Sequence, residues 1–472
     1  MVAPLSTLRS LVDDRLTPLL VASAIGVYVL VLAGATTSLL HAGGTCGTWP
    51  TCQGNLVAIG TPQTTVAWAH RALGVLVGLV LATTFLSAKR NGPSRVSRIV
   101  TLAAVAYPVQ AVLGAIIAVS GDTAVLAALH LTVALSIFTG LLVGLLWRLE
   151  DRHGLPERPD HSAVEDVADP TPVASSTPSS ATYGLRTRIA AYVRMTKPRL
   201  MWLLALVAMA SMGLAAGPDL QVGTIVATVT GGVLAIGASG TFNQVYERDR
   251  DKYMGRTSDR PVVTDVVPPR RAVAFGLALA AASTGVFLVF VNALAAALGV
   301  LAILFYSVVY TMVLKPRTEH NTVLGGAVGA FPALIGWAAV TDQVGVPALV
   351  LGAVVFLWTP AHFYNLALIY KEDYARAGYP MLPVAAGDAV TRRHILLYLG
   401  ATMVAAVVLG TAAELGWFYA AASLVVGVVF LTAAVDLFRK RTERAAYRTF
   451  HAANAYLGVV LVAIVLDTLL VG

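Results

Sequence analysis

Apolar runs of about twenty residues, separated by short charged gaps, recur along almost the whole chain. An α-helix rises about 1.5 Å per residue, so about 20 apolar residues cross the hydrocarbon core of a bilayer, and each run predicts one membrane-spanning helix. With 57% hydrophobic and only 12% charged residues, the chain has too few polar side chains to cover a soluble globule. The sequence therefore predicts an all-α polytopic membrane protein.

The apolar runs form a group of four and a group of nine. We expect the first four spans near residues 17–39, 65–86, 100–119 and 124–147. We expect the other nine near residues 200–216, 222–242, 272–292, 293–314, 322–340, 346–367, 395–411, 415–437 and 453–471. Between the groups, the composition turns to Pro, Ser, Thr and charged residues, which cannot bury a core. The prediction is a four-helix transmembrane bundle in 1–149, a disordered cytoplasmic linker in 150–190 and a nine-helix bundle in 191–472.

The net charge of +8 is carried by Lys and Arg in the short gaps, a pattern that marks the cytoplasmic side of membrane proteins rather than a nucleic-acid surface. The loop 41–64 contains no Lys or Arg, whereas the next loop contains Lys89, Arg90 and Arg95. We therefore expect a multi-pass protein of the cell membrane, with a cytoplasmic N-terminus, an external C-terminus and no nucleic-acid partner.

The predicted external loop holds both cysteines of the chain, Cys46 and Cys52. An external pair can form a disulfide; two free thiols or a metal clip are the alternatives. His70 and His130 each lie about six residues inside the outer end of a span, so their imidazoles should lie at similar depth. Two facing intramembrane histidines suit an axial pair for haem iron, and the alternative is a pair of interfacial histidines bonded to backbone.

One polar stretch, residues 243–261, directly follows the second span of the larger group. If the helix continues, Asn243, Glu247 and Asp251 fall at i, i+4 and i+8 and stack on one face. Oxygen ligands without Cys or His favour Mg²⁺, which proteins commonly bind together with substrate phosphates. Basic residues interleave with the acids: Arg248, Arg250, Lys252, Arg256 and Arg260. The stretch predicts a diphosphate site, and a charged cytoplasmic loop is the alternative.

A second acidic segment, with Glu372 and Asp373, ends the sixth span of the larger group. Both segments follow spans that run from outside to inside, so two four-span repeats would place two acidic clusters on one cytoplasmic rim, across a cavity. The loop that begins at Lys315 adds basic and amide groups to that rim. Three nearby glycines predict close helix packing rather than a ligand contact: Gly325, Gly326 and Gly329.

Several motifs of the larger group occur together in one family. They are Thr196-Lys197-Pro198-Arg199, the Asn243–Asp251 run, Met254-x-Arg256-Thr257-x-x-Arg260, Lys315-x-Arg317-Thr318 with Asn321, Pro360-x-His362-Phe363, and Lys371 to Pro383. With them, about residues 196–472 resemble the UbiA-type intramembrane prenyltransferases, and among these the branch that acts on haem. The last motif is quite specific to that branch.

The resemblance implies transfer of a farnesyl group from farnesyl diphosphate to a vinyl group of haem b, with Mg²⁺ as cofactor and an apolar chamber that keeps water from the allylic cation. Asn243, Glu247 and Asp251, with Asp373 opposite, would hold Mg²⁺, although Glu247 stands where the family usually has Asp. Either Glu372 or Asp373 could meet the metal. The leaving diphosphate would contact Arg199, Arg256, Arg260, Lys315 and Lys371. His362 would contact the haem iron or a propionate, and helix packing is its alternative role.

The first group resembles one half of haem A synthase, through Cys46 and Cys52, the pair His70-Arg71, and His130 between two leucines. That family has eight spans where four are expected here, and Ala67 stands where a glutamate is expected. We therefore expect haem binding or transfer rather than oxidation, alone, with a second copy or with haem A synthase as a partner. For the whole chain, the alternatives are another prenyl acceptor, such as a quinone precursor or a lipid glycerol, and a non-enzymatic haem-delivery or transport protein.

Overall fold

The computed structural model describes residues 15–40, 42–121, 123–154 and 184–470, and within these ranges the chain is helical, with no strand beyond one isolated bridge. Thirteen of the described helices are long and apolar enough to cross a membrane, which confirms the predicted multi-pass membrane protein. The backbone forms two compact units, residues 1–155 with 414–439 and residues 156–413 with 440–472. By backbone contacts, the span expected at 415–437 is grouped with the first unit, and the division into four and nine spans stays a prediction.

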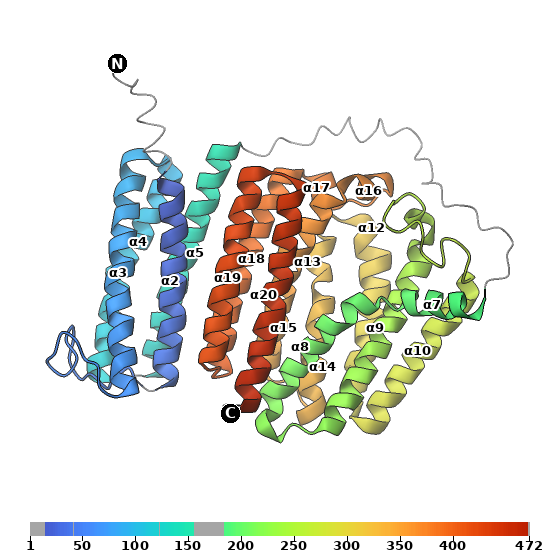
Figure 1. Ribbon diagram of the computed structural model, residues 1–472, viewed down its shortest axis with the longest axis horizontal. Helices are drawn as coiled ribbons and strands as arrows, with labels where there is room; N and C mark the ends of the chain where they lie inside the picture. Colours follow the sequence, from blue (N-terminus) through green and yellow to red (C-terminus); the bar gives the residue numbers. More distant parts are fainter. Residues whose placement is uncertain (1–14, 41, 122, 155–183, 471–472) are drawn as a thin grey trace, which may run out of the picture. The chain divides into compact units, whose positions relative to one another are not determined.

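The first unit contains five described helices (Figure 1): α2 (Leu16–Leu39), α3 (Pro62–Asn91), α4 (Ser94–Ser120), α5 (Ala124–His153) and α19 (Trp417–Lys440). α2 packs on α3 and α5, and α4 packs on α3 and α5, which closes these four into a bundle. The hydroxyls of Thr61 and Thr123 cap α3 and α5 by accepting the backbone N–H three residues on, each at 3.3 Å. The two hairpins of the bundle therefore begin their second helices in the same way.

The second unit contains eight long helices: α8 (Pro198–Ala216), α9 (Val222–Asp251), α10 (Pro269–Phe290), α11 (Ala293–Leu304), α14 (Ala327–Thr341), α15 (Val346–Ile369), α18 (Asp388–Ala412) and α20 (Glu443–Leu470). Shorter elements connect them: α7 (Leu185–Met195), η1 (Gly217–Asp219), η2 (Phe305–Leu314), α12 (Lys315–Arg317), α13 (Asn321–Gly325), α16 (Lys371–Arg376) and α17 (Leu382–Ala385). Neighbours in sequence pack together, as α9 does on α10, while α14 packs on both α8 and α15 and thereby joins the two halves of the unit.

Two elements differ from the sequence prediction. Most of the predicted linker lies outside the described residues, but α5 continues to His153 and α7 begins at Leu185, so helices occupy both of its ends. The fourth span of the unit is not one uniform helix, because α11 passes into η2, a π-helix of ten residues. π-Helical turns are rare and occur frequently at functional sites.

Glycines allow close packing where α13 and α14 meet α15. A methyl group on Gly326 would lie 2.9 Å from the backbone oxygen of Phe356, so only glycine fits there. Gly325 and Gly329 face the side chains of Tyr310 and Val355. This is the packing role that the sequence predicts for the three glycines.

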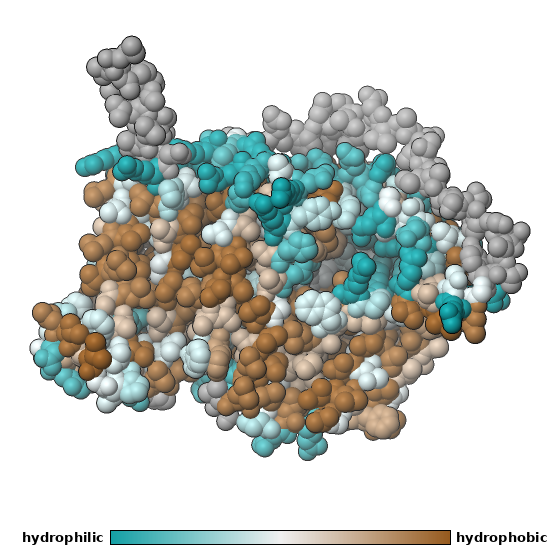
Figure 2. All heavy atoms as spheres, in the orientation of Figure 1, coloured by the Kyte–Doolittle hydropathy of each residue, from teal (hydrophilic) through white to brown (hydrophobic). Residues whose placement is uncertain are grey.

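Polar residues of the second unit gather at one end of its helices. Figure 2 shows hydrophobic residues over the visible flanks of the helices and hydrophilic residues over the end where α16 and α17 lie. The same end receives the C-terminus of α9 and the loop 252–268, whose polar side chains form the candidate site.

Candidate active site

The site begins with a line of polar side chains on α9. This helix continues without a break to Asp251, so Asn243, Glu247 and Asp251 lie one turn apart on one face. All three are buried, with exposed fractions of 2%, 1% and 0%. Buried carboxylates are costly without partners, so the partners of this line determine what the site can bind.

Two cations bind the carboxylates. Lys315 donates a hydrogen bond to Oε1 of Glu247, and Arg260 lies 3.3 Å from Oε2 of Glu247 and 2.5 Å from Oδ2 of Asp251. Burial lowers the pKa of Arg260, but Asp251 and Glu247 outweigh this effect and raise it above its ordinary value. Oδ1 of Asp251 is buried and has no hydrogen-bond partner among the described residues. One carboxylate oxygen is therefore available to a further cation.

Lys197 joins this line to the fourth span. It lies just before α8, and its Nζ donates to Oδ1 of Asn243 and to the hydroxyl of Tyr306, the latter at 3.1 Å. Asn243 donates in turn to Oγ1 of Thr311 at 3.2 Å. Burial, together with the positive charge of Arg260, lowers the pKa of Lys197 to about 7.

The π-helical geometry of η2 explains how one helix supplies several of these groups. The hydroxyl of Thr311 bonds to the backbone oxygen of Tyr306, five residues earlier, at 2.8 Å. In a π-helix residues five apart lie close to one face, which aligns Tyr306 with Thr311 and Tyr310 with Lys315. An α-helix would turn the second member of each pair away by more than a third of a turn.

Asp373 contacts the loop 252–268 and not the carboxylates of α9. Its Oδ1 and Oδ2 accept the backbone N–H groups of Gly255 and Arg256, each at 3.2 Å, and Arg376 pairs with Oδ1. Within the described residues, no three His, Cys, Asp or Glu side chains are placed to hold a metal ion. Glu372 is exposed. The two acidic segments do meet at one rim, but Asp373 meets the backbone of the loop 252–268.

Aromatic rings support the remaining cations. The guanidinium of Arg256 lies 5.0 Å from the ring of Tyr370 and also donates to the hydroxyl of Tyr374. The ring of Tyr379 contacts Lys315 at 4.5 Å and Arg250 at 4.8 Å. Burial raises the pKa of Tyr374 and of Tyr379, so both phenols stay neutral and act as cation–π partners rather than as counter-ions.

Cations exceed carboxylates in this cluster. Three carboxylates, of Glu247, Asp251 and Asp373, are accompanied by five cationic side chains: Lys197, Arg256, Arg260, Lys315 and Arg376. The surplus of positive charge, which includes the exposed Arg256 and Arg376, suits an anion, and guanidinium and ammonium groups are the usual donors to phosphate.

Two predicted diphosphate ligands are not brought to the cluster. Lys371 pairs with Asp388 at 2.8 Å, and Arg199 is exposed at the start of α8, with no hydrogen bond or ion pair to the cluster among the described residues.

An apolar chamber of about 270 Å³ begins where the charged cluster ends. Lys197 and Tyr306 belong to both, and the rest of the chamber wall is mostly aliphatic and aromatic. Along α9 the lining extends from Ser239 to Thr228, and along α8 from Lys197 to Ala208. Eleven residues at about 1.5 Å each make the chamber roughly 16 Å deep. The arrangement can bind a charged head group with a long apolar tail.

His362 lies beside this chamber, not in it. Its ring is stacked between Trp358 at 4.3 Å and Phe450 at 4.5 Å, measured between ring centroids. Trp358 and Phe363 line the chamber, whereas His362 is absent from the described lining. This position fits the helix-packing alternative. Trp358 lies between His362 and the chamber.

A second candidate site lies within the first unit. His70 lies on α3 and His130 on α5, so each hairpin of the bundle contributes one histidine. A methyl group on Gly34 of α2 would lie 3.2 Å from Cε1 of His70, and one on Gly114 of α4 would lie 3.2 Å from Cε1 of His130. Both imidazoles are thus placed in the same way by the two hairpins, and Nδ1 of His70 is buried with no hydrogen-bond partner in the described chain.

The loop 41–64 is fastened next to His70. Cys46 and Cys52 form a disulfide, the first of the alternatives that the sequence left open. Arg71 donates to the backbone oxygens of Thr48 and Thr51, at 2.9 and 2.7 Å, inside the loop that the disulfide closes.

Sequence reasoning missed several groups of the charged cluster. Lys197 lies in a motif that we singled out, but we assigned the diphosphate contact to Arg199 of that motif. Tyr306, Tyr310 and Thr311 lie in an apolar run that gives no sign of a π-helix. Tyr379 follows the second acidic segment, and an aromatic residue next to so many cations could have indicated a cation–π partner.

Comparison with known proteins gives consistent matches for both parts of the chain. The model of the UbiA prenyltransferase family matches residues 203–458, and that of a cytochrome oxidase assembly protein matches residues 17–169. A protein named protoheme IX farnesyltransferase from Haloarcula marismortui is 52% identical over 462 residues, which cover 96% of this chain and 98% of that protein. One of the same name from Halobacterium salinarum is 52% identical over 458 residues, with coverages of 96% and 97%.

A solved structure of a UbiA homologue from Archaeoglobus fulgidus, bound to DMAPP and Mg²⁺, covers 58% of this chain and 98% of its own, at 14% identity and a TM-score of 0.47.

Proposed function

Because the chain belongs to the UbiA prenyltransferase family, we propose that it transfers a farnesyl group from farnesyl diphosphate to a vinyl group of protohaem IX (haem b) and thereby makes haem O. The observation that carries this proposal is the junction at Lys197 and Tyr306, which belong both to a cluster with surplus positive charge and to an apolar chamber. A prenyl diphosphate has the matching form, with an anionic head and an apolar tail.

In the reaction, the C1–O bond of farnesyl diphosphate breaks and diphosphate leaves with the electron pair. The vinyl carbon of the porphyrin bonds to C1, water adds to the neighbouring carbon, and a proton is released. The hardest step is the departure of diphosphate, and preplaced cations stabilise the charge that develops on the leaving oxygen. Arg256, Arg260, Lys315 and Lys197 are the cations placed to do this. The aliphatic chamber wall keeps water from the allylic cation before the vinyl group reacts.

The donor set on α9 fits Mg²⁺. Oδ1 of Asp251 is buried without a hydrogen-bond partner in the described chain, and oxygen ligands from carboxylate and amide groups are those that Mg²⁺ prefers. We propose that Asn243, Glu247 and Asp251 hold the ion. When bound, Mg²⁺ supplies positive charge against the leaving diphosphate. Asp373 would act differently, by holding the loop that carries Arg256 and Arg260.

The first unit supports a separate haem site. Two imidazoles at matching positions in two hairpins suit a bis-histidine haem, and Nδ1 of His70 lacks a partner in the described chain. We propose that His70 and His130 bind haem b there. His362 would instead fix Trp358 in the chamber wall by stacking.

The orientation of the chain in the membrane is also a proposal. The basic loops between the spans support a cytoplasmic position for the rim that carries Asp251 and Asp373, and an external position for the Cys46–Cys52 loop.

The test is product formation in membranes supplied with haem b, Mg²⁺ and farnesyl diphosphate, read as the mass of the haem. We expect haem O from the unchanged chain and a loss of at least a hundredfold in Asp251→Asn. Asp249→Asn is the matched control, because Asp249 lies two residues away on α9 with an 86% exposed side chain paired to Lys252. Equal losses in both variants, or prenylation of a quinone precursor in place of haem, would contradict the proposal.

A further inference from the structure

Helix α7 carries an apolar ridge that the protein does not cover. Leu185, Ile189 and Val193 recur every four residues and are 74%, 55% and 53% exposed. The helix contains no acidic residue and three arginines: Arg186, Arg188 and Arg194. A ridge of three large aliphatic side chains beside arginines is typical of helices that lie in a membrane interface.

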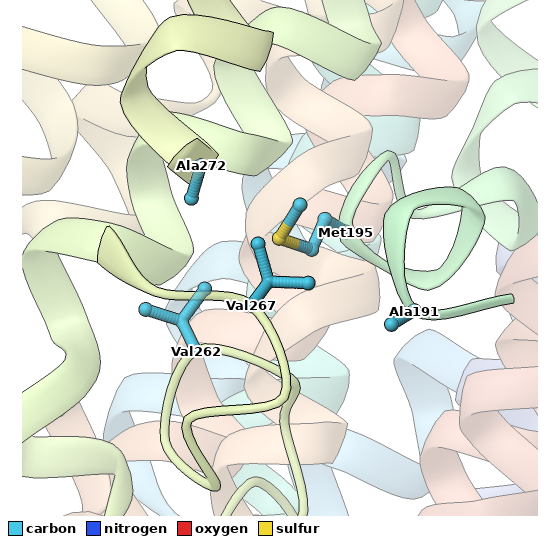
Figure 3. Packing of buried hydrophobic residues seen from close by; sticks show 5 residues of the cluster. All are labelled: Ala191, Met195, Val262, Val267 and Ala272. Atoms are coloured by element: carbon cyan, nitrogen blue, oxygen red, sulfur yellow. The ribbon is translucent and has the colours of Figure 1, made fainter. Parts of the chain in front are cut away.

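The opposite edge of α7 is fixed to the protein. Figure 3 shows Ala191 and Met195 of α7 packed with Val262 and Val267 of the loop 252–268 and with Ala272 of α10. All five side chains are at most 5% exposed.

Two polar contacts also join α7 to the protein. Gln244 donates to the backbone oxygen of Met195 at 3.1 Å, and Arg194 pairs with Asp259 at 2.7 Å. The ridge lies about 140° around the helix from the buried edge, at 100° per residue. Its exposure is therefore a fixed feature of the packing.

The position of α7 in the chain indicates what covers the ridge. Only Thr196 and Lys197 separate α7 from the membrane-spanning α8, and α7 runs crosswise to α8, α9 and α10 (Figure 1). In the first turns of α8, Leu200 and Trp202 are 52% and 56% exposed. Exposed tryptophan at the end of a spanning helix marks the boundary between lipid and water, so the ridge begins at that boundary.

We propose that α7 is an interfacial helix that inserts Leu185, Ile189 and Val193 into the leaflet on the active-site side and binds anionic lipid head groups through Arg186 and Arg188. On a helical wheel Arg186 falls beside Val193, and Arg188 falls between the ridge and the buried edge. Arg186 thus borders the ridge, Arg188 lies toward the buried edge, and both can reach the lipid phosphates of the interface.

The contacts of α7 give this position a consequence for the site. The loop 252–268 carries Arg256 and Arg260, and α7 holds this loop through Met195 and through the ion pair with Asp259. Lipid that fixes α7 therefore also fixes the loop. The location of α7 in the membrane can be measured without turnover, so the test below does not depend on the farnesyltransferase proposal.

The test uses a single spin label in the full chain. The only two cysteines are joined to each other, so an introduced cysteine is the only free thiol. Nitroxides at Ile189→Cys and, as the control on the polar face, at Thr187→Cys are compared in vesicles of phosphatidylcholine and phosphatidylglycerol. At position 189 we expect oxygen, which dissolves in the membrane, to increase the relaxation rate of the label more than a water-soluble nickel complex does. At position 187 we expect the nickel complex to have the larger effect. A label at 189 that is open to the nickel complex would overturn the proposal, and so would one shielded from both reagents, since protein would then cover the ridge.

The head-group part has its own measurement. In vesicles of phosphatidylcholine alone, the label at 189 should become more open to the nickel complex than in the mixed vesicles. In the Arg186→Gln/Arg188→Gln variant this difference between the two vesicle types should disappear. An unchanged depth of the label in both vesicle types would overturn the role of the arginines.

Discussion

Replacing Asp373 by Asn separates two roles for this carboxylate, metal ligand and loop clamp. In the structure its two oxygens accept the N–H groups of Gly255 and Arg256, both at 3.2 Å. An Asn side chain offers one acceptor and turns an NH₂ group toward the other N–H, so one charge-assisted hydrogen bond is lost and one part-buried N–H is left without an acceptor. Such a bond contributes about 1.5–3 kcal/mol. The ion pair with Arg376 adds little, because that guanidinium is 42% exposed.

This energy sets the size of the expected effect. The clamped loop carries Arg256 and Arg260, so a loosened loop weakens diphosphate binding, and 1.4 kcal/mol corresponds to tenfold. We expect the KM for farnesyl diphosphate to rise by about 10-fold to 150-fold in Asp373→Asn, the upper limit applying if the loop is ordered only through this carboxylate. The Mg²⁺ concentration for half-maximal activity should stay unchanged.

The assay is haem O formation measured over a grid of farnesyl diphosphate and Mg²⁺ concentrations. Asp251→Asn serves as the comparison, because its unpartnered oxygen predicts a shift along the Mg²⁺ axis. Glu372→Gln is the matched control for charge, since Glu372 is exposed next to Asp373. If Asp373→Asn shifts the Mg²⁺ requirement and leaves the KM for farnesyl diphosphate unchanged, Asp373 is a metal ligand and the clamp is wrong.

Three further predictions concern other parts of the chain. His70→Ala should remove a low-spin haem spectrum that His362→Ala leaves intact, and a spectrum that survives in His70→Ala would return His70 to a packing role. Lys197 has a pKa of about 7 in the folded chain and 10.5 in the unfolded chain, so between these values the unfolded chain holds one more proton and the folded state gains stability as the pH rises. The melting temperature should therefore rise with pH across this window, and it should rise less in Lys197→Met. Parallel curves for the two proteins would refute this. Gly326→Ala should destabilise the protein by about 1–3 kcal/mol through overpacking, whereas Gly223→Ala, which meets no neighbour within 4 Å, should not; equal melting temperatures would contradict the close approach to Phe356.

The sequence predicted those features that depend on one helix at a time. The spans follow from the length of the apolar runs, and the alignment of Asn243, Glu247 and Asp251 follows from a spacing of four within a continuous helix. The register of η2 is different. Its residues are apolar or aromatic like those of any spanning helix, and nothing in the run from Phe305 to Leu314 distinguishes a π-helical from an α-helical turn.

Partnerships between distant segments were the other source of error. Lys371 and Asp373 are two residues apart, and both were assigned to the diphosphate or its metal. In the structure Lys371 pairs with Asp388, and Asp373 pairs with a loop more than a hundred residues earlier. Residue type and local spacing identify charged groups near the rim, but only the packing of α15 and α16 against the loop decides which group faces which.

Acidic and basic residues alternate in residues 243–260 because the two kinds of side chain neutralise each other when no ligand is bound. Glu247 and Asp251 are almost fully buried, and without a ligand they need Lys315 and Arg260 as counter-ions. Under the proposed function, an incoming diphosphate attracts the same two cations. Each carboxylate it deprives of a partner is then an unpaired buried charge, which favours binding of a divalent cation on the same face. Diphosphate and metal ion should therefore bind this site more tightly together than either does alone, because the coupling is reciprocal.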